Sequence, residues 1–147
     1  MRAVIQNVSR ASVAVDGKII NHIGKGLLIY LGIHQTDTEV EAHQMALKLI
    51  KLRIFEDHQH KLNLSVQDIK GSILIISQFT LYGDTQKGNR PSFTKAMEPE
   101  RAKALYNIVM EELKKSVPTF GGVFQAHMDV ESVNNGPVTV IHDINGV

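Results

Sequence analysis

The sequence predicts an α+β protein in which mixed, mainly antiparallel β-sheets pack against two main helices. Three observations indicate this class: β-branched runs with turn signals at both ends of the chain, two separate helical periodicities, and the lack of either common glycine-rich phosphate loop. The 147 residues show no internal repeat, linker or low-complexity tract. We therefore expect residues 1–147 to form a single domain.

The chain is expected to begin with antiparallel strands. Residues 2–8 and 11–15 carry alternating, β-branched apolar side chains, and the Asp-Gly pair at 16–17 favours a hairpin turn into residues 18–23. The apolar run over residues 27–33 is unbroken. Such a run is typical of a central strand that is buried on both faces.

Two helices are predicted, one near the middle of each half of the chain. Thr38, followed by acidic residues in the first turn, favours a helix of roughly four turns. One face of this helix is expected to contain Ala42, Ala46, Leu49, Ile50 and Arg53. Pro99, between two glutamates, favours the start of the second helix. The buried face of that helix is expected to contain Leu105, Ile108, Val109 and Leu113.

The remaining apolar runs predict four further strands. They lie at residues 53–57, 72–81, 123–133 and 138–143. The stretch YGDTQKGNRPSF, residues 82–93, is polar and contains glycine and proline, which indicates a loop.

Composition excludes several classes of protein. The formal net charge of +1 is too small for a strongly electrostatic grip on nucleic acid, although a small basic patch beside an RNA end is compatible with it. The absence of cysteine excludes disulfides, thiol nucleophiles and cysteine-ligated metals. The first residues lack an apolar run with a cleavage site, so we expect a cytoplasmic location and no membrane partner.

The stretch NNGPVT, residues 134–139, interrupts two strand signals with a Gly-Pro pair. Proline has no N–H to donate to a sheet, and glycine loses the most conformational entropy when it is fixed. One interpretation is a hairpin turn. The other is a backbone segment whose carbonyl groups face a ligand, with Pro137 fixing their direction through a cis bond.

Polar residues also follow the apolar run ILII. Ser77, Gln78 and Thr80 can hold a polar substrate, and backbone N–H groups at this strand end can stabilise an oxyanion. Alternatively, the strand turns outward here and its polar groups bond locally. In the loop that follows, Lys87 and Arg90 are either phosphate contacts or solubilising charges.

Two histidine-containing stretches are weaker candidates. Residues 56–60, EDHQH, favour a solvated loop over a metal site, because no further ligand cluster lies at a suitable spacing. His127 precedes Asp129 by two residues, but no spacing marks a catalytic triad. We therefore expect His127 to be a structural or pocket-wall residue.

Three motifs in order, SQFTL (77–81), KGNRPSF (87–93) and NNGPVT (134–139), closely resemble the D-aminoacyl-tRNA deacylases. The resemblance extends from the first strand to the last. It implies hydrolysis of the ester bond of D-aminoacyl-tRNA and mischarged glycyl-tRNA, which releases the amino acid and free tRNA. It also implies a homodimer that acts in chiral proofreading without a metal or other cofactor, with the tRNA 3′ end as partner and no DNA partner.

The same resemblance assigns roles to individual residues. Gly136-Pro137 is implied to be a cis dipeptide that enters the partner subunit's pocket, where its carbonyl oxygens capture the substrate ammonium. Such a rigid backbone rejects an L side chain by steric exclusion. The implied catalytic residues are Ser77, Gln78, Phe79 and Thr80, the substrate-binding residues are Met128, Asn134, Gly136, Pro137, Val138 and Thr139, and the tRNA-binding residues are Lys87 and Arg90.

Two catalytic hypotheses follow from the resemblance. In the preferred one, the backbone N–H groups of Phe79 and Thr80 bind the ester carbonyl while the 2′-hydroxyl of the terminal adenosine assists. In the other, Thr80 is a nucleophile. Asn7 stands where the family commonly has arginine, Leu62 where methionine is frequent, and Gln125 where a small residue is usual. Alternative functions are a non-catalytic module that binds the tRNA 3′ end and a general threonine-dependent esterase.

Overall fold

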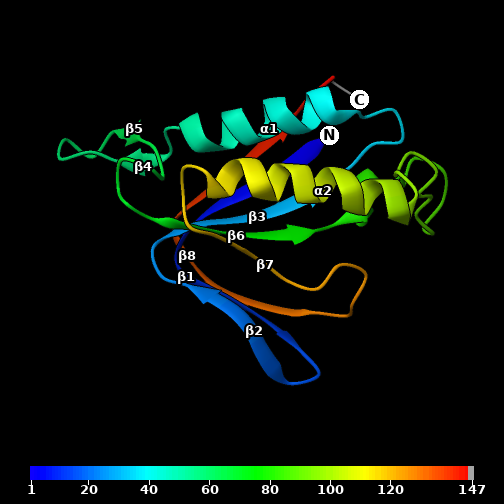
Figure 1. Ribbon diagram of the computed structural model, residues 1–147, viewed down its shortest axis with the longest axis horizontal. Coiled ribbons are helices and arrows are strands. Elements are labelled where there is room, and N and C mark those ends of the chain that lie inside the picture. The colour runs from blue at the N-terminus through cyan, green and yellow to red at the C-terminus, as the bar shows by residue number, and fades with distance from the viewer. Residues whose placement is uncertain (146–147) are drawn as a thin grey trace.

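The computed structural model describes residues 1–145, in which two helices cover one face of a six-stranded sheet (Figure 1). The strand order is β2-β1-β3-β6-β7, and β8 also pairs with β1. These strands are β1 (Arg2–Val15), β2 (Lys18–Ile23), β3 (Gly26–Gly32), β6 (Ser72–Ser77), β7 (Thr119–Gly121) and β8 (Asp129–Asp143). The other elements are α1 (Glu39–Lys51), α2 (Pro99–Lys114), a 3-10 helix (Phe79–Tyr82), and the small sheet of β4 (Phe55–Glu56) and β5 (Leu62–Leu64).

This architecture confirms the predicted mixed α+β class. Strand β1 is antiparallel to β2, β3 and β8, whereas β3–β6 and β6–β7 are parallel pairs. Residue 147, where the expected domain ends, lies outside the described residues. Among residues 1–145, no helix is long and apolar enough to cross a membrane.

Strand β1 joins the two short strands predicted at the N-terminus. Its register against β8 shifts on either side of Val8, and such bulges turn side chains to the other face without ending a strand. Ala3 and Ile5 therefore pack with the helices, whereas Val8 and Val13 pack in a second cluster with Leu28 and Ile76. One strand thus contributes to both hydrophobic clusters.

Helix α1 begins at its predicted cap. The Thr38 hydroxyl accepts a hydrogen bond from the Val40 N–H, and Glu41 accepts one from the Thr38 N–H at 2.7 Å. The expected place of Arg53 on this helix is wrong, because the helix ends at Lys51 and the chain becomes extended at Leu52. Arg53 Nε instead donates to Asn63 O at 2.7 Å. The residues that α1 buries are Ala42, Met45, Ala46, Leu49 and Ile50.

Helix α2 also begins as predicted, with Pro99 in its first turn and the Glu98 carboxylate as the cap. Its buried residues are Ala102, Leu105, Tyr106, Val109 and Leu113. Tyr106 is buried although the sequence pattern did not include it, whereas Ile108, which the pattern did include, is only partly buried. The predicted and observed buried faces share Leu105, Val109 and Leu113, so the expected side of the helix is correct.

Three predicted strands have different bounds. The strand expected over 72–81 ends at Ser77, and the 3-10 helix follows. The strand expected over 53–57 is reduced to Phe55–Glu56. The two strands expected over 123–133 and 138–143 are replaced by a turn that follows β7 and by the single long strand β8. The hairpin-turn interpretation of NNGPVT is wrong, because residues 134–139 lie inside β8.

Candidate active site

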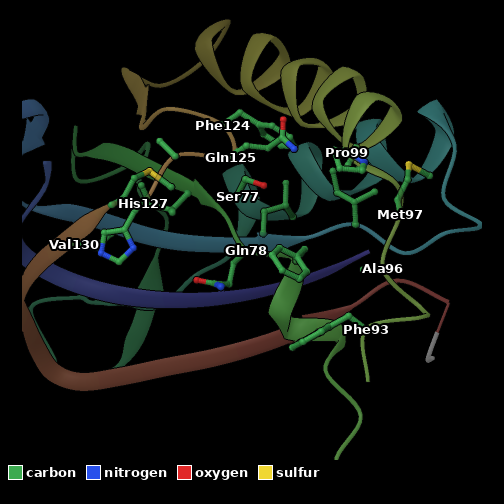
Figure 2. A pocket seen from close by; sticks show the side chains of 17 residues that line it. Ser77, Gln78, Phe93, Ala96, Met97, Pro99, Phe124, Gln125, His127 and Val130 are labelled. Atoms are coloured by element: carbon green, nitrogen blue, oxygen red, sulfur yellow. The ribbon is translucent and has the colours of Figure 1, made fainter. Parts of the chain in front are cut away.

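A cavity of about 570 Å³ opens where β6 ends beneath the first turn of α2 (Figure 2). This volume is in the range of pockets that bind small molecules. Among residues 1–145, no Asp, Glu, Lys or Arg side chain lines it. Its polar lining comes from Ser77, Gln78, Gln125 and His127, and its apolar lining from Leu31, Ile33, Ile76, Phe79, Phe93, Ala96, Met97, Pro99, Ala102, Phe124, Ala126, Met128 and Val130.

The end of β6 brings two of the implied catalytic residues to the cavity. Ser77 is the last residue of the strand and pairs with Leu31 of β3, and the Gln78 N–H donates to Leu31 O at 2.8 Å. The carboxyl ends of β3 and β6 therefore meet at the cavity wall. The polar interruption after ILII marks this strand end.

The 3-10 helix orients backbone N–H groups next to Ser77. The Leu81 N–H donates to Gln78 O at 3.3 Å, and the Gly83 N–H donates to Thr80 O at 2.9 Å. A 3-10 helix bonds each N–H to the carbonyl three residues earlier. The first such bond is donated by Leu81, so the N–H groups of Phe79 and Thr80 donate no hydrogen bond within this turn.

The Thr80 hydroxyl accepts a hydrogen bond from the Gln78 side-chain amide. Thr80 is exposed and does not line the cavity. Among residues 1–145, no carboxylate, imidazole or amine shares a hydrogen bond with this hydroxyl. An amide is not a base, so the surroundings of Thr80 do not activate it as a nucleophile.

An aromatic pair stands at the mouth of the cavity. The Phe79 and Phe93 rings meet edge to face with centroids 5.2 Å apart, and 56% of Phe79 is exposed. A Cβ atom at Gly83 would come within 3.0 Å of Phe93 Cε1. The small residue at position 83 therefore lets the Phe93 ring pack closely over the turn.

The loop after β3 forms another part of the wall, and Asp37 holds it. One Asp37 carboxylate oxygen accepts from the His34 N–H at 2.7 Å, and the other lies 2.9 Å from the Met1 amino nitrogen. Both Met1 and Asp37 are buried. Because Ile33 precedes this loop and lines the cavity, the buried pair fixes that part of the wall.

Residues 123–130 form the opposite wall. Met128 and His127 line the cavity, and the His127 imidazole lies beside Val130 (Figure 2). The expectation that His127 is a pocket-wall residue is consistent with this position. Phe124 packs against Tyr106 with ring centroids 5.8 Å apart, and Tyr106 donates its hydroxyl to Ile75 O at 2.8 Å. Burial raises the pKa of Tyr106 to about 12.

The NNGPVT segment lies outside the cavity of its own chain. The Gly136-Pro137 peptide bond is cis, and both residues are exposed. Asn134 and Thr139 are paired with Val8 and Gln6 of β1, so the residues between them bulge out opposite Asn7. None of Asn134, Gly136, Pro137, Val138 and Thr139 lines the cavity formed by residues 1–145.

The charged candidates lie away from the cavity lining. Lys87 and Arg90 are exposed in the loop after the 3-10 helix. The two ends of this loop are joined by backbone hydrogen bonds between Asp84 and Ser92 at 2.8 and 2.9 Å. Residues 56–60 belong to the β4–β5 region, far from the first turn of α2 (Figure 1). There, the exposed His60 Nδ1 lies 3.2 Å from Glu56 Oε2.

Comparison with known proteins identifies the family. The family model described as D-Tyr-tRNA(Tyr) deacylase matches residues 4–143. The chain belongs to this deacylase family. Proteins named D-aminoacyl-tRNA deacylase from Persephonella marina and Koribacter versatilis are 55% and 54% identical to it, over 97% of both chains in each case. Members of the family are hydrolases.

Two solved structures have the same fold as this deacylase. One, titled c-Myc DNA Unwinding Element Binding Protein, is 42% identical with a TM-score of 0.94, over 99% of this chain and 100% of that chain. The other is titled as a probable eukaryotic D-amino acid tRNA deacylase. It is 18% identical with a TM-score of 0.86, over 97% of this chain and 98% of that chain, so this similarity shows the fold alone.

The structure gathers only part of the predicted site. Ser77, Gln78, Phe79 and Met128 lie together in the cavity wall. Sequence reasoning missed an apolar half of the wall, formed by Ile33, Ala96, Met97, Pro99, Ala102 and Phe124. The position of Ile33 at the end of a strand parallel to β6 was an available signal. Residues 96–102 carried only the signal of a helix start.

Proposed function

We propose that this deacylase hydrolyses the ester bond of D-aminoacyl-tRNA and of mischarged glycyl-tRNA in the cytoplasm, as a homodimer that proofreads chirality. Its family membership supports the reaction class. The observation that carries the proposal is the position of the Phe79 and Thr80 N–H groups, which lie in the turn beside the cavity and donate no hydrogen bond within it. Donors fixed in this way stabilise charge that develops in a transition state.

In this mechanism the protein positions an ester that is already activated. The N–H groups of Phe79 and Thr80 hold the ester carbonyl oxygen, and water attacks the carbonyl carbon to give a tetrahedral oxyanion. The bond to the ribose oxygen then breaks, and that oxygen takes a proton as the amino acid leaves. The 2′-hydroxyl of the terminal adenosine assists the proton transfer, since no base contacts Thr80 among the described residues.

Ser77 and Gln78 orient the substrate in this scheme. Ser77 lies in the cavity wall directly before the turn, and its hydroxyl is placed for a polar group of the aminoacyl moiety or for the attacking water. The Gln78 amide is bonded to the Thr80 hydroxyl, which stabilises the turn that carries the N–H donors. Catalysis then depends on geometry more than on an activated side chain.

Chiral selection is assigned to a second copy of the chain. The cavity offers no carboxylate among residues 1–145 to balance the substrate ammonium. The exposed Gly136-Pro137 segment lies outside its own cavity, so its carbonyl oxygens are available to another subunit. In that arrangement, Asn134, Val138 and Thr139 support the inserted segment, which excludes an L side chain by contact.

Lys87 and Arg90 are assigned to the tRNA backbone. Both are exposed in the loop next to the Phe79–Phe93 pair at the cavity mouth. Cationic side chains bind phosphate oxygens without reading sequence. Two contacts of this kind suit the weakly basic chain, and hydrolysis should slow as salt concentration rises.

The test is hydrolysis of matched D-tyrosyl-tRNA, L-tyrosyl-tRNA and glycyl-tRNA by purified protein, with and without a chelator. We expect rapid loss of the D and glycyl esters alone, whether or not the chelator is present. Thr80→Ala should retain substantial turnover, and complete loss of turnover with intact binding would indicate a threonine nucleophile. Protection of every ester would instead support a module that binds the tRNA 3′ end. Cleavage of small activated esters without tRNA would support a general esterase.

A further inference from the structure

The amino group of Met1 is buried. Its nitrogen lies 2.9 Å from Asp37 Oδ1 and 3.4 Å from the carbonyl oxygen of Ile144. Only 1% of Met1 is exposed, and its side chain packs in the hydrophobic cluster beneath the helices. Figure 1 shows this end of β1 beside the loop that leads into α1. A buried ammonium group needs an anionic partner, and the Asp37 carboxylate is that partner.

An acyl group does not fit on this nitrogen unless its neighbours move. A formyl or acetyl group places a carbonyl carbon about 1.3 Å from the nitrogen, at a residue that has almost no contact with solvent. It also removes the positive charge, which leaves the buried Asp37 carboxylate without this cation. The Met1 carbonyl is fixed as well, because it accepts from the Ile144 N–H at 2.9 Å. Acylation therefore costs both packing and a buried ion pair.

The Asp37 carboxylate also holds the loop behind the cavity wall. Its Oδ2 accepts from the His34 N–H at 2.7 Å, directly after Ile33, which lines the cavity. The buried His34 ring meets the Tyr82 ring edge to face, with centroids 5.2 Å apart. Tyr82 is the last residue of the 3-10 helix beside the cavity. A displacement of Asp37 is therefore transmitted to the cavity wall and to this helix.

The residue after Met1 provides a second connection to the same 3-10 helix. Arg2 Nη1 donates to Leu81 O at 2.9 Å, directly after the residues that present the Phe79 and Thr80 N–H groups. A chain end that does not dock moves Arg2 with it. Small displacements of groups that hold reacting atoms are costly. A blocked amino group should therefore lower activity more than the loss of stability explains.

We propose that the Met1 nitrogen is a modification site that controls this deacylase, because a formyl or acetyl group there breaks the pair with Asp37 and lowers activity. The inference rests on the burial of the nitrogen and goes beyond the proposed function. Where translation starts with formylmethionine, hydrolysis of the formamide has to precede docking of the chain end. Water cleaves the bond between the nitrogen and the formyl carbon, and the proton of the formic acid passes to the amine. The products are formate and the ammonium group that Asp37 binds.

The test compares protein that has a free amino group with protein that retains a formyl group. The formylated form is made in a bacterial host treated with a deformylase inhibitor, and its intact mass identifies it. We expect it to melt about 10 °C lower, since breaking a buried ion pair is costly. At a temperature at which both forms are folded, it should hydrolyse D-tyrosyl-tRNA at least about tenfold more slowly.

Treatment with purified peptide deformylase is the rescue experiment. An end that does not dock is accessible to this enzyme, so the treatment should restore both the melting temperature and the rate. A formylated chain that is unfolded before the treatment and folded after it supports the proposal equally. A formyl group that the enzyme removes without any change in melting temperature or rate would contradict it.

Asp37→Asn separates the ion pair from the space that the acyl group needs. It keeps a carbonyl oxygen for the His34 N–H but removes the negative charge. Two changes that break the same ion pair are not additive. Formylation should therefore lower the melting temperature of Asp37→Asn by less than about half as much as that of the unaltered protein.

Asp57→Asn is the matched control. Asp57 Oδ1 also accepts from backbone N–H groups of a turn, those of Gln59 at 2.8 Å and Lys61 at 3.1 Å, but the residue does not line the cavity. With a free amino group, Asp57→Asn should hydrolyse D-tyrosyl-tRNA at the rate of the unaltered protein. Formylation should lower its melting temperature and rate by the full amount.

Three results would overturn the proposal. The first is a formylated protein that melts and hydrolyses as the free form does. The second is an equal effect of formylation on the melting temperature of the unaltered protein, Asp37→Asn and Asp57→Asn. The third is a lower melting temperature with an unchanged rate, which would contradict the connection to the cavity. If the free form hydrolyses no D-tyrosyl-tRNA, the proposed function fails, and the melting temperatures and the deformylase treatment still decide whether the nitrogen has to be free.

Discussion

Arg2 donates a hydrogen bond from Nη1 to the carbonyl oxygen of Leu81 at 2.9 Å. The same guanidinium donates from Nε to Asp143 Oδ1 at 2.7 Å and lies 5.2 Å from the centre of the Tyr82 ring. The hydrogen bond to Asp143 is the main cause that raises the pKa of Arg2. One side chain thus connects the start of β1, the 3-10 helix and the end of β8.

These contacts predict a positioning role for Arg2. We expect Arg2→Met to reduce kcat about tenfold or more, because the turn that carries the Phe79 and Thr80 N–H groups loses its link to β8, and small misplacements near reacting groups are costly. The loss of unfolding free energy should be modest, about 1 kcal/mol, since the ion pair is partly exposed. Steady-state kinetics and urea unfolding measure the two effects.

Arg53→Met is the control for this variant. Arg53 also donates Nε to a backbone carbonyl, that of Asn63 at 2.7 Å, but it lies outside the cavity. The Arg53→Met variant should retain full kcat. An equal loss of kcat in both variants would show that Arg2 acts only through general stability.

A pair of glycines predicts a large difference in stability. Gly26 pairs with Ser72 where β3 and β6 begin, and a Cβ atom there would lie 1.8 Å from Ser72 O. Gly26→Ala should therefore cost more than about 3 kcal/mol by forcing the two central strands apart. Gly24→Ala, two residues earlier, meets nothing within 4 Å, and should change unfolding free energy by less than about 0.5 kcal/mol. Thermal and urea unfolding of the two variants test this contrast.

The α1 cap predicts a dependence of stability on pH. The hydrogen bonds from Thr38 lower the pKa of Glu41 to about 2, below its ordinary value of 4.5. A carboxylate whose pKa is lower in the folded state stabilises the fold above its unfolded pKa, and this stabilisation disappears as pH falls from about 5 to about 2. Thr38→Ala should cost about 1 kcal/mol at pH 7 and clearly less at pH 2.5.

Urea unfolding at the two pH values measures this difference, with Thr94→Ala, an exposed threonine outside the helices, as the control. The control should differ from the unaltered protein by less than about 0.5 kcal/mol at both pH values. A cost of Thr38→Ala that is the same at pH 7 and pH 2.5 would contradict the coupling between Thr38 and Glu41.

Local signals predicted most of the elements, because caps and periodicity depend on neighbouring residues. Thr38 and Pro99 begin their helices as expected, and the apolar run of residues 27–33 becomes the central strand β3, which is confirmed over residues 27–32. The long strands were divided wrongly. The bulges around Val8 and the Gly136-Pro137 pair resemble breaks in the sequence, yet pairing between β1 and β8 resumes on either side of them.

The candidate site was predictable only where chemistry is concentrated in one stretch of sequence. Ser77 and Gln78 interrupt an apolar strand, so polarity alone marked them. Met97 and Phe124 carry no such mark, because apolar side chains are as common in a core as in a pocket. Tertiary packing alone brings them opposite β6, as both line the cavity with Ser77.

Asn7 provides the last prediction, because it is a buried amide beneath the bulge that contains Gly136-Pro137. Only 6% of it is exposed, and Nδ2 donates to Ile54 O at 2.9 Å. Asn7→Asp replaces this donor with a carboxylate facing a carbonyl oxygen, so we expect a loss of about 3 kcal/mol or more at pH 7. Burial should raise the folded pKa of the new carboxyl above its unfolded value, so the loss should shrink as pH falls to 4 and the group becomes a protonated donor.

Asn63→Asp is the control, at a more exposed amide that donates to Asp57 at 3.1 Å, and it should cost less at pH 7. Urea unfolding of both variants at pH 4 and pH 7 checks this, and a cost of Asn7→Asp that does not change with pH would show that position 7 does not bury the carboxyl against Ile54.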